Sequence, residues 1–91
     1  MIEDVINMDQ EYVAEFAGDY LVGAGPVLSE REGFYIYENI LDRTVRTTDG
    51  NAEMLLLFDN KNEILKEIKK MKKRVENSIL EPYQKALDAL M

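Results

Sequence analysis

The sequence predicts an α+β fold with an N-terminal helix, a small antiparallel β-sheet, and a long C-terminal helix. Three observations predict it: apolar residues at helical spacing near the start, runs of strand-forming residues in the middle, and an amphipathic pattern over the last third. With 91 residues, the chain is expected to form a single small domain spanning 1–91, because chains divide into separate cores only at much greater length.

The N-terminal helix is predicted over residues 2–17, either as one helix or as a shorter helix capped by Asn7 or Asp9. Val5, Met8, Tyr12 and Phe16 recur at steps of three or four, which places them on one face of a helix. Gly18 follows at the position where a left-handed residue commonly ends a helix. The next segment, residues 22–26, contains two glycines and a proline and is interpreted as a connector.

Strands are predicted at residues 34–37, 44–48 and 54–58, which are rich in aromatic, β-branched and other apolar side chains. Asp49-Gly50 separates the second run from the third and is a strong signal for a tight turn. The sequence therefore predicts a β-hairpin around Asp49-Gly50.

The long C-terminal helix is predicted to begin after Asp59 or Asn60, either of which can cap it. A kink or break is expected near Pro82, because proline lacks the amide hydrogen that an interior helical position needs. Along this helix an apolar stripe recurs at helical spacing: Ile64, Ile68, Met71, Val75 and Ile79.

Two predicted strands are apolar at successive positions, so both of their faces carry side chains that favour burial. A second copy of the protein could cover the face that the helices leave open, and we expect a homodimer or higher oligomer. The alternative is that Tyr35 and Tyr37 keep their hydroxyl groups in water while the helices cover both faces. The residues expected to mediate self-association are Tyr35, Tyr37, Leu55, Leu56, Leu57 and Phe58.

Charge is distributed unevenly along the chain, whose net charge is −7. Residues 1–60 hold thirteen acidic and three basic residues, whereas residues 61–91 hold eight basic and five acidic ones. The basic side chains of the last helix gather opposite its apolar stripe, where three interpretations stay open: a solvated face, a face docked on acidic residues, or an anion-binding face. The candidate anion-binding residues are Lys66, Lys69, Lys70, Lys73 and Arg74, with Arg43 and Arg46 as possible additional contacts.

The sequence contains no histidine and no cysteine. This removes the imidazole and thiol groups on which most nucleophilic catalysis and most zinc, haem and iron–sulfur sites depend. We therefore expect no catalytic residues, no metal site and no cofactor, and a protein that is not an enzyme. The acidic first ten residues differ from a signal peptide and no apolar run could span a bilayer, which favours a cytoplasmic protein with no membrane partner.

From the sequence we hypothesise a small, acidic, non-catalytic interaction protein, homo-oligomeric, that docks on another macromolecule as an adaptor or inhibitor. The predicted order of helix, small sheet and long helix resembles that of small inhibitor and accessory proteins of bacteriophages, an analogy of fold that assigns no residue a role. The alternative is a binder of nucleotides or nucleic acid through the basic face of the last helix.

Overall fold

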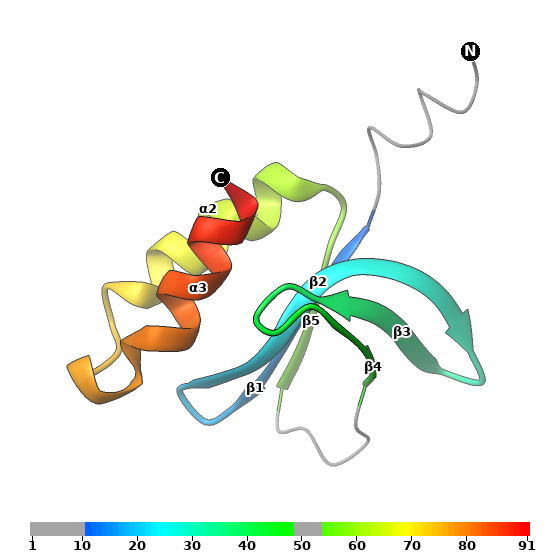
Figure 1. Cartoon of the computed structure of the whole chain (residues 1–91), viewed down its shortest axis with the longest axis horizontal. Helices are drawn as coiled ribbons and strands as arrows, with labels where there is room; N and C mark the ends of the chain where they lie inside the picture. The colour runs from blue at the N-terminus through cyan, green and yellow to red at the C-terminus, as the bar shows by residue number, and fades with distance from the viewer. Residues whose placement is uncertain (1–10, 49–53) are drawn as a thin grey trace.

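The computed structural model in Figure 1 describes residues 11–48 and 54–91. Within these ranges, five strands come first and helices follow them. The strands form one antiparallel sheet in the order β4-β3-β2-β1-β5, so β5 returns to pair with β1. Their bounds are β1 Tyr12–Ala17, β2 Tyr20–Arg31, β3 Phe34–Asn39, β4 Thr44–Thr47 and β5 Met54–Phe58.

The predicted N-terminal helix is wrong in the part that the structure describes, because its last residues form strand β1. Residues 2–10 of that prediction lie outside the described residues. In β1 alternate side chains face opposite sides of the sheet: Ala14 and Phe16 join the hydrophobic core, and Glu15 faces the other way. The resemblance to small bacteriophage proteins rested on the order helix, sheet, helix, and the structure does not support that order. Gly18 does adopt the positive φ expected of it, at 63°, but in the turn between β1 and β2.

The predicted hairpin around Asp49-Gly50 is also wrong, although the three strands predicted around it exist. Strand β4 pairs with β3 and β5 pairs with β1, so these two strands lie at opposite edges of the sheet. Asp49 and Gly50 themselves lie outside the described residues. Turn chemistry alone could not reveal that β1 offers the third strand a partner.

The segment interpreted as a connector, residues 22–26, lies inside β2, the longest strand. In Figure 1 this strand curves, and its first half pairs with β1 while its second half pairs with β3. Glycine is required at position 25, because a Cβ atom on Gly25 would lie 1.7 Å from the backbone oxygen of Glu38. The backbone at the end of β3 therefore lies directly against Gly25 of β2.

The hydrophobic core lies between the helices and one face of the sheet, which we call the helix face. Strand residues Ala14, Phe16, Leu21 and Ala24 contribute to it from β1 and β2. The helices supply Ile64 and Ile68 from α2 (Lys61–Lys72) and Tyr83, Ala86, Leu87 and Leu90 from α3 (Leu80–Leu90). The Tyr83 hydroxyl donates a hydrogen bond of 2.5 Å to the backbone oxygen of Asp19, which joins α3 to the β1–β2 turn.

The C-terminal helix begins as predicted and breaks earlier than predicted. The Asn60 side chain caps α2 by accepting a hydrogen bond of 3.0 Å from the backbone amide of Glu63. Helix α2 ends at Lys72, and a short 3-10 helix, η1 (Asn77–Ile79), precedes α3. Pro82 lies buried in the first turn of α3, where the missing amide hydrogen costs no helical bond.

We predict that Gly25→Ala lowers the free energy of unfolding by at least about 2 kcal/mol, because the new methyl group would overlap the backbone of Glu38. Gly33→Ala is the matched control. Unlike Gly25, Gly33 has a positive φ, 85°, but its Cβ would meet no atom within 4 Å, so only backbone strain of about 1 kcal/mol is expected. Urea unfolding measures both, and equal losses would contradict the close approach of β2 to the end of β3.

Candidate functional site

The second face of the sheet carries a buried charged residue, and we call it the Glu15 face. Glu15 lies in the middle of β1 and its side chain has no exposed surface. Its Oε1 atom accepts a hydrogen bond of 2.5 Å from the Tyr37 hydroxyl and one of 2.9 Å from Nε of Arg46. Tyr37 and Arg46 are cross-strand partners on β3 and β4, so three strands meet at one carboxylate.

The Glu15 network requires a glycine on the strand beneath it. Gly23 is the cross-strand partner of Glu15 on β2. A Cβ atom there would lie 2.4 Å from the Tyr37 hydroxyl and 3.3 Å from Cδ of Arg46. The missing side chain of Gly23 therefore leaves the space that the phenol and the guanidinium occupy above β2.

The electrostatics of the network follow from burial and from the hydrogen bonds. Burial of the Tyr37 phenol, followed by its hydrogen bond to the Glu15 carboxylate, raises the pKa of Tyr37 well above its ordinary value. The hydrogen bond to Glu15 likewise raises the pKa of Arg46. The phenol thus stays protonated and the guanidinium charged, and both act as donors to one acceptor.

Sequence reasoning missed Glu15 and Tyr37 as partners and assigned Arg46 to an anion site. A signal was present: once residues 12–16 are read as a strand, Glu15 alternates with Ala14 and Phe16 and must face the side opposite the core. A carboxylate that is buried on a sheet face needs a cation or strong hydrogen-bond donors there. Arg46 meets that need from a neighbouring strand, so its charge already has a partner.

The residues predicted to mediate self-association divide between the two faces. Leu56 and Phe58 pack against the core on the helix face. Leu55 and Leu57 are the cross-strand partners of Glu15 and Val13, so they lie on the Glu15 face, where 39% and 46% of their surface is exposed. Tyr37 is fully buried beside Glu15, and Tyr35 lies half-buried on β3.

The basic residues predicted to bind anions do not form one cluster. Five of them lie on α2 or directly after its end, all exposed, and none makes an ion pair with a residue in the described ranges: Lys66, Lys69, Lys70, Lys73 and Arg74. Helix α2 packs against β1 and β5, whereas Arg43 and Arg46 belong to the far edge of the sheet. Arg43 pairs there with Glu38 at 3.5 Å.

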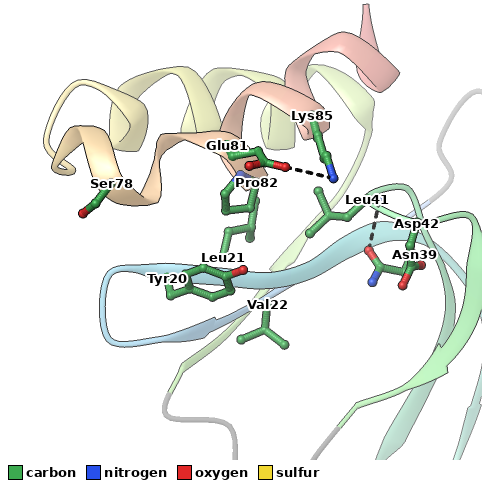
Figure 2. A pocket seen from close by; sticks show the side chains of 10 residues that line it. All are labelled: Tyr20, Leu21, Val22, Asn39, Leu41, Asp42, Ser78, Glu81, Pro82 and Lys85. Atoms are coloured by element: carbon green, nitrogen blue, oxygen red, sulfur yellow. Dashed lines mark hydrogen bonds and ion pairs between the residues drawn. The ribbon is translucent and has the colours of Figure 1, made fainter.

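Figure 2 shows a pocket of about 290 Å³ between the start of β2, the turn after β3, and the start of α3. Leu21, Leu41 and Pro82 contribute apolar surface to it, and Lys85 pairs with Glu81 at 3.2 Å on its rim. Asn39 lines it and holds the turn in place, because its Oδ1 accepts hydrogen bonds from the backbone amides of Ala24 and Leu41. Its remaining lining residues are Tyr20, Val22, Asp42 and Ser78.

Comparisons of the chain with protein-family models, with curated proteins and with solved structures found no match. Over residues 11–48 and 54–91 no group of three or more acidic side chains is arranged to hold a metal ion. Neither of the described α-helices has the length and apolar character to cross a membrane.

We predict that Arg46→Leu lowers the free energy of unfolding by about 3 kcal/mol, because it leaves the buried Glu15 carboxylate without its cation. Arg43→Leu serves as the control, since it removes the same charge from an exposed pair and should change stability by less than about 1 kcal/mol. Thermal and urea unfolding of both variants provide the measurement. Similar losses in the two would show that the Glu15 pair is no more important than a surface contact.

Stability should also fall as pH rises above about 10. Below the ordinary tyrosine pKa of 10.0 the phenol is protonated in both states, so its contribution is complete. Above it the unfolded chain loses the Tyr37 proton while the folded chain keeps it, and unfolding is favoured. Alkaline titration of phenolate absorbance, combined with unfolding curves, should give a shallower loss for Tyr37→Phe than for the parent. An identical pH dependence in both would argue against a buried phenol.

Proposed function

We propose that this protein is a non-catalytic interaction protein that self-associates through β5 and docks, in its assembled form, on another macromolecule as an adaptor or inhibitor. The observation that supports it most is the placement of Leu55 and Leu57. They lie exposed on an edge strand, on the face opposite the helices, while Leu56 of the same strand packs against the core.

An edge strand that presents both apolar side chains and unused backbone groups is a template for pairing with another strand. Among the described strands, β1 is the one that pairs with β5, which leaves the outer side of β5 without a described strand. Antiparallel pairing of two β5 strands about a two-fold axis would extend the sheet across the dimer. Leu55 and Leu57 of each copy would then meet on one face.

A small domain also benefits from the added burial, because its own core removes only a modest fraction of its apolar surface from water.

The network on the Glu15 face supports a structural rather than a reactive role for that face. Its carboxylate already accepts from a phenol and a guanidinium, and these donors hold it in place. The contact with a further macromolecule would use the acidic part of the chain, where exposed carboxylates surround the sheet: Glu11, Asp19, Glu30, Glu32 and Asp42.

The alternative, a binder of nucleotides or nucleic acid, rests on the basic residues of α2 and of the turn directly after it. Its five exposed cations have no acidic partner among the described residues, which favours an anionic ligand. The two arginines that were expected to assist are each paired with a glutamate on the sheet. This alternative therefore depends on lysines and Arg74 alone.

We expect the protein to sediment at about twice its 10.5 kDa chain mass at micromolar concentration. Leu57→Lys should weaken self-association by about tenfold or more, because it replaces an apolar contact between the two β5 strands with like charges from the two copies on the same face of the sheet. Leu28→Lys is the matched control, since Leu28 on β2 is also exposed, at 55%, and the change in net charge is the same. Sedimentation equilibrium measures both variants.

Two results would contradict this assembly. A mass of one chain at every concentration would exclude self-association of the parent protein. Equal weakening by Leu57→Lys and Leu28→Lys would mean that added charge, rather than the β5 surface, controls association. Far-ultraviolet circular dichroism verifies that each variant retains its fold, which is expected because both leucines are already exposed.

A further inference from the structure

A second cavity lies along the contact between α2 and α3, the two helices seen side by side in Figure 1. It has a volume of about 440 Å³, within the range of sites that bind small molecules, and its lining is mainly apolar. Leu80 and Leu87 of α3 line one wall, two helical turns apart, and Lys69, Lys72 and Lys73 line the other. We call it the α2–α3 groove.

The α2–α3 groove combines an apolar wall with an excess of positive charge. Each lysine offers an apolar stem to the cavity and an ammonium group at its end. No carboxylate lines the groove. On α3, Glu81 pairs with Lys85, and Asp88 accepts a hydrogen bond from Gln84. Lys72 donates to the Gln84 side chain, a neutral group, so its charge is not compensated.

The arrangement of these lysines is unfavourable without an anion. Lys69 lies three residues from Lys72 and four from Lys73, the spacings at which like charges on a helix repel each other. Neither Lys69 nor Lys73 makes an ion pair with any residue in the described ranges. An anionic group bound between them would relieve this repulsion.

We propose that the α2–α3 groove binds a single-chain anionic amphiphile of the fatty-acid type. Its hydrocarbon chain lies against Leu80 and Leu87, and the ammonium groups of Lys69 and Lys73 hold its carboxylate. A nucleic acid fits less well, because no aromatic side chain lines the groove for a base to stack on. This proposal is independent of self-association through β5, since Leu55 and Leu57 lie on the opposite face of the sheet from the helices.

The test is a titration of the protein with decanoate, observed through the methyl resonances of Leu80 and Leu87 in a leucine-methyl-labelled sample. We expect saturable shifts confined to the α2–α3 groove. Octanoate, two methylenes shorter, should bind about tenfold more weakly if the chain is buried. Decanol, which has the same chain and no charge, should bind at least about tenfold more weakly because it lacks the charge-assisted contacts.

Two double variants separate the groove from the general charge of the helix. Lys69→Gln with Lys73→Gln should weaken decanoate binding by about tenfold or more, since both contacts to the carboxylate are lost. Lys66→Gln with Lys70→Gln removes the same charge from the same helix at positions that do not line the cavity. We expect this control to bind decanoate within about twofold of the parent.

Several outcomes would overturn the proposal. Equal weakening by the two double variants would mean that α2 attracts anions by its net charge alone. Binding to vesicles of phosphatidylglycerol without saturable binding of decanoate would assign the lysines to a membrane surface instead. Methyl shifts of Leu80 and Leu87 that follow protein concentration in the absence of decanoate would show that a second copy occupies the groove.

Discussion

The carboxylate of Glu15 is the constraint on which the arrangement of the sheet depends. A buried charge is tolerated only where a cation and hydrogen-bond donors surround it, and here both come from strands far along the sequence. Tyr37 and Arg46 can reach it only because β2 curves and because Gly23 leaves room above its backbone. One side chain on β1 therefore holds β3 and β4 in place on the far side of β2 in the sheet.

The two faces of the sheet meet different physical requirements. On the helix face, apolar side chains from β1, β2 and both helices exclude water and stabilise the fold through the hydrophobic effect, which has no preferred direction. On the Glu15 face, the contacts are directional, and shifting a strand by one residue would place a hydrophobic side chain where the carboxylate must be. The polar network thus selects one strand register, while the hydrophobic core provides most of the stabilisation.

Local patterns in the sequence predicted what depends on local chemistry. Runs of aromatic, aliphatic and β-branched residues predicted strands at 34–37, 44–48 and 54–58, where the structure has β3, β4 and β5, and the capping side chain of Asn60 predicted the start of α2. Pairing of strands could not be predicted in this way, because β5 finds its partner on β1, some forty residues earlier. The spacing of Tyr12, Val13 and Phe16 fits a helix and a strand equally well. The strand is favoured because it places Glu15 opposite the core, where Tyr37 and Arg46 bind its carboxylate.

The same limitation applies to the candidate sites. Exposure of Leu55 and Leu57 but not Leu56 could be expected from strand alternation alone once β5 was placed. The role of Arg46 could not be expected from the sequence, because the sequence shows that Arg46 is charged but not that the Glu15 carboxylate lies beside it. The α2–α3 groove depends on the break after Lys72. This break lets α3 pack against α2, so that Leu80 and Leu87 lie beside the lysines that line the groove.

The separation of β4 and β5 at opposite edges has a consequence for how the chain acquires its structure. Strands β1 to β4 pair with their sequence neighbours, so each of these pairings closes only a short loop. The pairing of Tyr12 with Phe58 closes a much longer loop and is entropically the most demanding step. During synthesis the β1–β5 pair can form only after β5 has left the ribosome, and α2, which packs against both strands, follows β5 along the chain.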